Sequence, residues 1–278
     1  MWFEHPHLRQ LIELALAEDI GTGDHATHAC LDPQREGTAH VRAKSELVVC
    51  GTALFTQVMQ RVDPRLRVDC HLADGQRAAV GQQVLSVHGP LAAILTAERT
   101  ALNFMQRMSG IATQTAAFVQ AVAGTSARIV DTRKTLPGFR SLDKYAVRCG
   151  GGHNHRTALD AGILIKENHT HAAGSIAQAV AAARQVGSHF LKVEVEVETL
   201  ADLDAALAAG AEIILLDNMD IPTLRQAVQQ TAGRAMLEAS GNMSLDRVRQ
   251  VAETGVDLIS VGALTHSVVA ADLSLRIV

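Results

Sequence analysis

Aromatic side chains are scarce in this chain, making up 3% of its 278 residues, with one Trp and one Tyr. Net positive charge is also absent, because the formal net charge is -4 at pH 7. Proteins that bind nucleic acid usually combine a basic surface with aromatic stacking, so the sequence argues against that class. Hydrophobic residues reach 47%, and the core must therefore be aliphatic, as in Ala-, Leu- and Val-rich helices packed on a sheet.

Cysteines are few and widely spaced. Cys30, Cys50, Cys70 and Cys149 form no C-x-x-C pair, a pattern that fits thiols in a reducing compartment better than disulfides or a zinc site. The first ten residues, MWFEHPHLRQ, lack an apolar signal core, and no stretch of about 18 uninterrupted apolar residues exists. We therefore expect a cytoplasmic location and no membrane contact.

The first part of the chain predicts a small domain. Residues 7–19 carry a helical apolar stripe, and short strand-like runs separated by turns fill residues 37–87. Residues 91–123 read as helical, with Gly110 in the middle. We expect this segment to split near Gly110 into two helices, which places the domains at 1–110 and 111–278, with the extreme C-terminus allowed to pack back on the N-terminal domain.

A repeating pattern begins after residue 127. Apolar runs alternate with Ala-rich helical stretches, and each run ends in polar residues, as a parallel sheet with helical crossovers requires. The runs are RIVD (128–131), GILI (162–165), KVEVEV (192–197), EIILL (212–216), AMLEA (235–239) and DLISV (257–261). Polar residues at the carboxyl ends of such strands are typical of a βα barrel. Six runs predict an incomplete barrel or one with a seventh strand that the sequence does not reveal, and an open doubly wound sheet is the alternative.

Basic and imidazole side chains gather within residues 131–169. Arg133 and Lys134 directly follow the first run, flanked by Thr132. Two adjacent cations repel each other unless an anion lies between them. A solvated turn is the ordinary explanation for an Arg-Lys pair, but the strand-end position favours ligand binding. On an acidic chain, such a local cluster indicates a pocket for a small anionic molecule.

Three glycines at 150–152 introduce His153, His155 and Arg156. Glycine lets the backbone approach a ligand closely. In an extended segment both histidines point to one side, so an H-x-H zinc site is conceivable. Arg156 and Lys166 cannot serve as metal ligands, and cationic contact with a substrate is the favoured interpretation.

Carboxylates follow the next strands. Glu194, Glu196 and Glu198 alternate along one strand and point to one face, which is costly inside a barrel unless they are paired or exposed at its mouth. Glu196 and Asp217 end neighbouring strands, an arrangement that suits a hydrated Mg²⁺ bound to substrate oxygens. Structural salt bridges to Lys166 and Arg133 are the alternative, above all for Glu194.

Small-residue loops follow the last two strands. They are Ser240-Gly241-Asn242 and the segment that begins at Gly262. Backbone N–H groups of such loops bind phosphate, and the last strands of barrels commonly do so. With no Ser or Cys nucleophile beside a base, the set indicates a phosphorylated sugar that reacts by charge-stabilised displacement.

These motifs resemble those of the quinolinate phosphoribosyltransferase family over nearly the whole chain. They are EDIGTGD (18–24), ERTALNFMQRMSGIAT (98–113), DTRKTLPGFR (131–140), DKYAVRCGGGHNHR (143–156), LIKENH (164–169), VEVEVE (193–198), LLDN (215–218), LEASGN (237–242) and VGALTHS (261–267). The resemblance implies an N-terminal α/β sandwich and a C-terminal incomplete, TIM-like βα barrel. It implies a transferase that joins quinolinate and phosphoribosyl pyrophosphate, with Mg²⁺, to give nicotinate mononucleotide, pyrophosphate and CO₂ in NAD biosynthesis.

The resemblance also assigns residues. Arg133, Lys134, His155 and Arg156, beside Thr132, are expected to hold the two carboxylates of quinolinate. The catalytic group around the ribose and Mg-pyrophosphate is expected to be Lys166, Glu196 and Asp217, the last two also being the Mg²⁺ residues. The phosphate is expected to contact Ser240, Gly241, Asn242, Gly262 and His266. Arg99 is expected to reach the site of the partner subunit in a homodimer with shared active sites, which leaves open whether dimers assemble further.

Two other functions stay open from the sequence. One is a paralogous pyrophosphorylase associated with molybdate transport genes, which shares the scaffold but acts on another substrate. The other is a non-catalytic dimer that senses phosphoribosyl compounds. The dense cationic group favours quinolinate over the first, and the retention of Glu196 and Asp217 argues against the second.

Overall fold

The computed structural model describes residues 6–278, which divide into two compact units. Of the described residues, the N-terminal unit comprises 6–114, Arg148–Gly151 and Val268–Val278, and the C-terminal unit comprises Thr115–Val147 and Gly152–Ser267. In residues 6–278, no helix is both long and apolar enough to span a bilayer.

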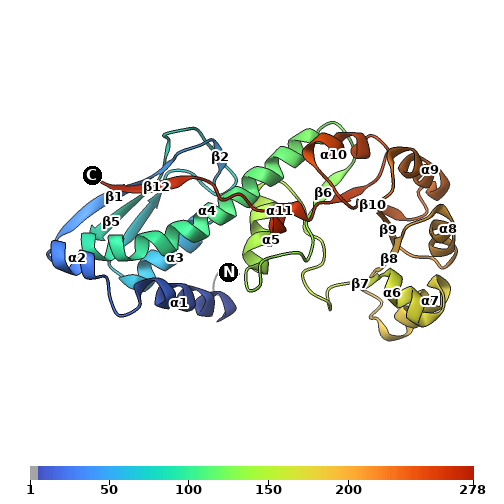
Figure 1. Cartoon of the computed structure of the whole chain (residues 1–278), viewed down its shortest axis with the longest axis horizontal. Helices are drawn as coiled ribbons and strands as arrows, with labels where there is room; N and C mark the ends of the chain where they lie inside the picture. The colour runs from blue at the N-terminus through green and yellow to red at the C-terminus, as the bar shows by residue number, and fades with distance from the viewer. Residues whose placement is uncertain (1–5) are drawn as a thin grey trace. The chain divides into compact units, whose positions relative to one another are not determined.

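The N-terminal unit is built on an antiparallel sheet. Its strands run in the order β12-β1-β5-β3, and a separate pair joins β2 to β4. The strands are β1 (Glu36–Ala43), β2 (Leu47–Val48), β3 (Arg67–Cys70), β4 (Arg77–Ala78), β5 (Gln83–Pro90) and β12 (Leu273–Ile277). Helices α1 (Pro6–Ile20), α2 (His25–Cys30), α3 (Thr52–Val62) and the first part of α4 (Leu91–Ala121) complete the unit (Figure 1). The small sheet-containing domain predicted from residues 37–87 is confirmed.

Helix α4 is continuous, so the predicted break near Gly110 was wrong. Glycine is required at position 110 for a different reason. A Cβ atom built on Gly110 would collide with the carbonyl oxygen of Val269 and lie 3.1 Å from Cα of Ala270. The segment that leads into β12 therefore crosses the helix at a distance that only glycine permits. The helix tolerates one glycine because its other residues, among them many Ala, Leu and Met, favour helix.

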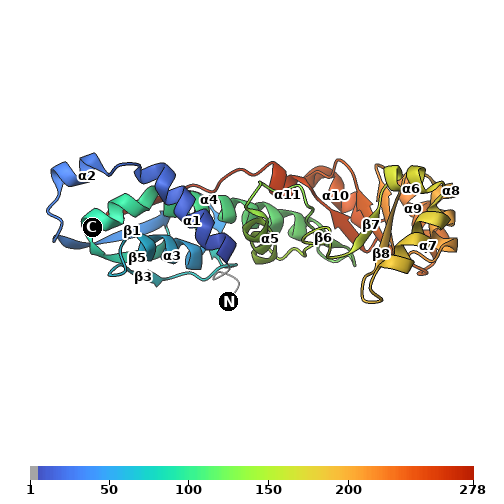
Figure 2. The same cartoon turned by 90° about the horizontal axis from the view of Figure 1, so that it is seen from below.

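The C-terminal unit contains the predicted six parallel strands. They are β6 (Arg128–Val130), β7 (Ile163–Ile165), β8 (Val193–Val197), β9 (Ile213–Asp217), β10 (Met236–Ser240) and β11 (Leu258–Ser260). The helices are α5 (Arg140–Cys149), α6 (Glu167–Ala173), α7 (Ile176–Val186), α8 (Leu200–Ala208), α9 (Ile221–Thr231), α10 (Leu245–Ala252) and α11 (Ala263–His266). Helices α7 to α10 follow one another around the outer side of the curved sheet, as Figures 1 and 2 show. This is the incomplete barrel, and the doubly wound alternative is excluded because helices cover one face only.

The barrel is open between its first two strands. The sheet order is β6-β11-β10-β9-β8-β7, so β6 and β7 are edges that do not pair with each other. His153 forms an isolated parallel bridge with Val130 on the free edge of β6. Its backbone N–H donates to Ile129 O (2.8 Å), and its carbonyl accepts from Asp131 N (3.1 Å). The segment after the three glycines thus stands where a further strand would begin.

Candidate active site at the carboxyl ends of the parallel strands

A cavity of about 540 Å³ lies where the parallel strands end. Every strand of the barrel contributes to it, because the carboxyl ends of parallel strands meet at one mouth. It is lined by Thr132, Arg133, Lys134, His155, Arg156, Leu164, Lys166, Glu196, Leu215, Asp217, Asn218, Glu238, Ser240, Gly241, Asn242 and Ser260. Most of the side chains predicted from the sequence therefore meet in one place.

Three predicted residues do not line this cavity. Gly262 lies beside it, since a Cβ built there would be 3.2 Å from Cδ of Lys134 and 3.1 Å from the ring of His266. The His266 ring pairs with the hydroxyl of Ser267, Nδ1 to Oγ, at 2.6 Å. Arg99 belongs to the N-terminal unit, where its side chain on α4 is half-exposed and 3.8 Å from Glu98.

Cationic groups occupy the side of the cavity formed after β6. Nε of Arg133 is buried and has no hydrogen-bond partner among the described residues. Burial, and after it the charge of Arg133, lowers the pKa of Arg156, which shows that the two guanidinium groups are close enough to repel. The Arg156 side chain is held by a hydrogen bond from Nη1 to Gly162 O (2.9 Å). Two such cations are stabilised when an anion binds between them.

A buried ion pair supports this side of the cavity. Lys144 Nζ lies 2.5 Å from Asp131 Oδ1 and donates to His155 O at 2.9 Å. Asp131 also accepts from His155 N (2.9 Å) and from Asn154 Nδ2 (2.6 Å). Burial raises the pKa of Asp131 and lowers that of Lys144, so each charge depends on the other. The network ties the end of β6 to the segment that carries His155 and Arg156.

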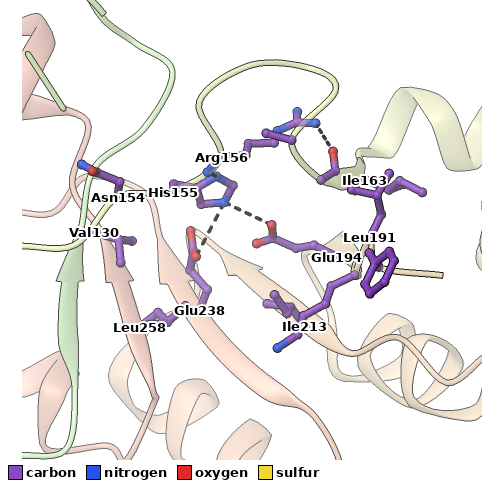
Figure 3. Close-up of a pocket in the computed structure, with 14 residues that line it drawn as sticks. Val130, Asn154, His155, Arg156, Ile163, Leu191, Glu194, Ile213, Glu238 and Leu258 are labelled. Atoms are coloured by element: carbon purple, nitrogen blue, oxygen red, sulfur yellow. Dashed lines mark hydrogen bonds and ion pairs between the residues drawn. The ribbon is translucent and has the colours of Figure 1, made fainter. Parts of the chain in front are cut away.

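The ring of His155 points into the barrel, between two carboxylates (Figure 3). Nδ1 accepts a hydrogen bond from the backbone N–H of Arg156 at 2.8 Å, so the ring proton is on Nε2. Nε2 donates to Glu194 Oε2 at 3.1 Å and lies 3.8 Å from Glu238 Oε2. Burial lowers the pKa of His155, but the bond to Glu194 and the charges of both carboxylates outweigh it, and the pKa is raised. A second ring proton would break the Arg156 bond. The expected direct contact between His155 and substrate therefore requires the ring to leave one of these partners.

Glu194 and Glu238 are deeply buried carboxylates beside His155, with 6% and 1% of their surfaces exposed, and Glu238 lines this cavity. Each has one oxygen, Oε1, without a hydrogen-bond partner among residues 6–278. Burial, and then repulsion from Glu194, raises the pKa of Glu238 to about 7. Together with His155, both carboxylates border a second cavity of about 340 Å³, whose lining includes the apolar strand residues Val130, Ile163, Ile213 and Leu258 (Figure 3). Sequence reasoning missed Glu238, although its place in LEASGN repeats the alternation that drew attention to Glu194.

Opposite the cations, the mouth carries paired polar groups. Lys166 Nζ forms a close ion pair with Glu196 Oε2. Asn218 Nδ2 donates to Asp217 Oδ2 (2.8 Å), and Asn242 Nδ2 donates to Asn218 Oδ1 (3.2 Å). Sequence reasoning did not single out Asn218, whose signal is its place directly after a strand-end aspartate. The expected pairing of Lys166 with a β8 carboxylate is present, and it involves Glu196 rather than Glu194.

Backbone conformation at this end is unusual. Asn218 and Asn242 adopt the left-handed region, with φ of 55° and 49°, and Gly241 has φ of 96°. A Cβ on Gly241 would collide with the side-chain oxygen of Asn218. Left-handed residues that are not glycine are uncommon and cluster at functional sites. Here they turn the chain sharply after β9 and β10, at residues that line the cavity.

Two sets of donors at this cavity could hold a cation. Glu196 and Asp217 offer carboxylate oxygens of the kind Mg²⁺ prefers. His155, Glu194 and Glu238 form a tighter set, with ligand atoms within 4.8 Å of one another. The H-x-H zinc alternative is not supported, because the ring of His155 lies beside Glu194 and Glu238 and not beside His153.

Comparison with known proteins gives a consistent result over both units. The family descriptions "Quinolinate phosphoribosyl transferase, N-terminal domain" and "C-terminal domain" match residues 24–109 and 111–276. A probable nicotinate-nucleotide pyrophosphorylase [carboxylating] from Bacillus subtilis is 42% identical over 98% of this chain and 94% of its own. The chloroplastic enzyme of that name from Arabidopsis thaliana is 43% identical, covering 98% and 84%. The solved nicotinate-nucleotide pyrophosphorylase from Francisella tularensis superposes with a TM-score of 0.94 at 41% identity, covering 97% of this chain and 95% of that one.

Proposed function

Because the chain belongs to the quinolinate phosphoribosyltransferase family, we propose that the cavity at the strand ends is where it acts. The reaction transfers a phosphoribosyl group from phosphoribosyl pyrophosphate to quinolinate with loss of CO₂. One observation carries the assignment to this cavity. The buried, unpartnered Nε of Arg133 and the guanidinium of Arg156 share it with Glu196 and Asp217. One side therefore suits a dianion and the other a ribose whose anomeric carbon becomes positive.

Quinolinate carries carboxylates on two neighbouring ring carbons, one of which is bonded to the ring nitrogen. Arg133, Lys134 and Arg156 are proposed to bind them, since two close cations gain most from a divalent anion. Thr132 and His155 line the same wall. The hydrogen bond from the backbone N–H of Arg156 to the His155 ring fixes the backbone at Arg156. His155 is thus proposed to orient Arg156 and to contact the substrate only when the ring turns.

The ribose and pyrophosphate are assigned to the opposite side. Glu196 and Asp217 are proposed to bind the ribose hydroxyls and to stabilise the oxocarbenium-like carbon as pyrophosphate departs. The oxygen donors present here fit Mg²⁺, which would screen the charge of the leaving pyrophosphate when bound. Lys166, held by Glu196, places a further positive charge on that side.

The 5′-phosphate is assigned to the last two strand ends. Backbone N–H groups after β10 and β11, around Ser240, Gly241, Asn242 and Gly262, are proposed to bind its oxygens, with His266 nearby. The left-handed turn at Gly241 and Asn242 supports this assignment, because both residues line the cavity. The phosphate thereby anchors the ribose before either bond changes.

Decarboxylation follows from the substrate itself. When the quinolinate nitrogen attacks the anomeric carbon, the nitrogen becomes quaternary and positively charged. It then stabilises the electron pair left on the ring carbon as the adjacent carboxylate leaves as CO₂, and that carbon takes up one proton. The cationic wall must hold the carboxylates without overstabilising the one that departs.

The proposal extends to assembly and location. Arg99, half-exposed on α4, is proposed to complete the site of a partner subunit in a homodimer, and the protein is proposed to be cytoplasmic. A mixture of Arg99→Ala and Lys166→Ala subunits should then recover activity, because one of the two sites in each mixed dimer is intact. Absence of recovery, with subunit exchange demonstrated, would count against shared sites.

The activity is tested by CO₂ release from carboxyl-labelled quinolinate, with and without phosphoribosyl pyrophosphate and Mg²⁺. Release that needs all three components is the expected result. Arg133→Ala should lower it by about 10- to 100-fold at subsaturating quinolinate, whereas Arg184→Ala, which removes a surface arginine paired with Glu212 on the outer side of the barrel, should not. No release from a folded, dimeric protein would favour the paralogous pyrophosphorylase.

A further inference from the structure

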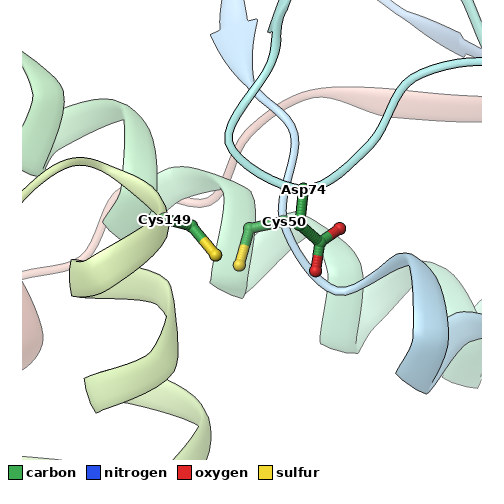
Figure 4. A group of neighbouring side chains, drawn as sticks. All are labelled: Cys50, Asp74 and Cys149. Atoms are coloured by element: carbon green, nitrogen blue, oxygen red, sulfur yellow. The ribbon is translucent and has the colours of Figure 1, made fainter.

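Two thiols and a carboxylate converge in the N-terminal unit (Figure 4). Cys50 lies just before α3, Asp74 in the turn between β3 and β4, and Cys149 at the last position of α5. One ligand atom from each, Sγ, Sγ and a carboxylate oxygen, lies within 4.8 Å of the others. Three separate segments of the chain thus bring chemically compatible donors together.

The backbone holds these donors in place. Cys50 N donates to Ser109 Oγ (3.0 Å), and Ser109 Oγ donates to Cys50 O (3.1 Å). Asp74 accepts from Gly51 N at Oδ2 and from Thr52 N at Oδ1, each at 3.0 Å. Two backbone N–H groups at the start of α3 thus hold both oxygens of this carboxylate in position. Preorganised donors of this kind lower the cost of binding a ligand.

The donor set selects a class of cation. Bonds of about 2.3 Å to sulfur and about 2.0–2.2 Å to oxygen in a tetrahedral zinc site put the donors roughly 3.5–3.8 Å apart. Atoms already within 4.8 Å of one another need to move by about 1 Å to reach this spacing. Two sulfur donors suit Zn²⁺ or Cd²⁺ and do not suit Mg²⁺.

We propose that Cys50, Cys149 and Asp74 bind a thiophilic divalent cation of the Zn²⁺ class as two thiolates and one carboxylate. Cys50 is fully buried, whereas Cys149 and Asp74 are partly exposed, so the ion enters from their side and a water completes its coordination. Two thiol protons leave as the two metal–sulfur bonds form, and nothing is oxidised or reduced. Burial raises the pKa of the Cys50 thiol, so the metal must displace that proton itself.

The proposal is tested with Co²⁺ as a spectroscopic probe on the reduced, chelator-treated full chain under anaerobic conditions. A sulfur-to-cobalt charge-transfer band should appear at one equivalent, and Zn²⁺ should bleach it. Zn²⁺ at about 100 times its dissociation constant should also raise the unfolding midpoint by roughly 5 °C or more. Cys30→Ser, at an exposed position on α2, should leave both signals unchanged.

Loss of the band in Cys50→Ser and in Cys149→Ser, and at least tenfold weaker binding in Asp74→Asn, would support the site. Because Cys50 is buried, the partly exposed Cys149→Ser decides the matter if Cys50→Ser does not fold. A band that survives in folded Cys149→Ser, or no band at all in the parent chain, would overturn the proposal. So would thiol titration showing that Cys50 and Cys149 form a disulfide instead. Since no outcome depends on turnover, failure here leaves the assigned reaction untouched.

Discussion

Two buried charged clusters in the barrel differ in how completely their hydrogen bonds are satisfied. Both oxygens of Asp131 have partners, supplied by Lys144, Asn154 and the backbone of the next segment. The cluster of His155, Glu194 and Glu238 leaves two carboxylate oxygens without partners. A satisfied network holds a backbone in place, whereas unsatisfied buried groups beside a cavity indicate chemistry still to be supplied by a ligand or a proton. The Asp131 cluster thus stabilises the fold, whereas the cluster of His155, Glu194 and Glu238 belongs to the active site.

The largest effect should follow from breaking the satisfied cluster. Asp131→Ala leaves Lys144 buried without a counter-charge, and it removes acceptors from Asn154 and the backbone. The free energy of unfolding should fall by about 3–5 kcal/mol, as measured by urea titration. A loss below about 1 kcal/mol would mean that the network is not a support.

The second cluster should respond to pH. Glu238 has a folded-state pKa raised to about 7 from 4.5, so its contribution to stability is full below about pH 4.5 and is lost as pH rises through about 7. Glu238→Gln, which stays neutral, should therefore gain stability relative to the parent chain across this window, by about 3 kcal/mol. Urea titrations at several pH values would measure the gain, with exposed Glu253→Gln as the control. A pH-independent difference between parent and Glu238→Gln would contradict the raised pKa.

Arg133 resembles the second cluster, because its Nε is also buried and has no hydrogen-bond partner among the described residues. We therefore expect it to contact the substrate. Arg133→Ala should weaken quinolinate binding by about 10- to 100-fold, as loss of a charged hydrogen bond of about 1.5–3 kcal/mol predicts. Affinity for phosphoribosyl pyrophosphate should be spared. Calorimetry with each substrate measures the two affinities separately. Unchanged quinolinate affinity would show that Arg133 does not bind this substrate.

The smallest effect on stability is expected at the mouth. Lys166 is half-exposed in its ion pair with Glu196, and exposed pairs contribute about 0–1 kcal/mol. Lys166→Ala should therefore change the free energy of unfolding by less than about 1 kcal/mol while lowering kcat. A larger loss of stability would place Lys166 with the supporting cluster rather than with the site.

The sequence predicted the parts that depend on local pattern. Six strands and their polar ends could be found because short apolar runs alternate with helical stretches and each run ends in polar residues. The ends of parallel strands meet at one mouth, which brought Arg133, Lys166 and Asp217 together. Glu238 escaped notice because it lies inside an apolar run, where one carboxylate looks like an isolated exception. The role of Glu238 becomes clear only beside Glu194, which lies on another strand and is distant in the sequence.

Other features that the sequence did not predict arise from long-range contacts. Gly110 suggests a helix break until the backbone at Val269 is seen to cross it. The His153 bridge that partly fills the open edge of the barrel depends on pairing with Val130. Cys50 and Cys149 are far apart in the sequence, and their spacing suggested unrelated thiols. In each case the partner is brought close only by the fold.

The pairing of β12 with β1 has a consequence for synthesis of the protein. Residues 273–277 are translated after the whole barrel, yet they form the edge of the sheet that contains residues 36–43. The N-terminal sheet therefore cannot be completed until the barrel has been made, although most of its strands emerge first. The edge of β1 must wait unpaired during translation of the entire barrel, a period in which exposed strands are prone to aggregate.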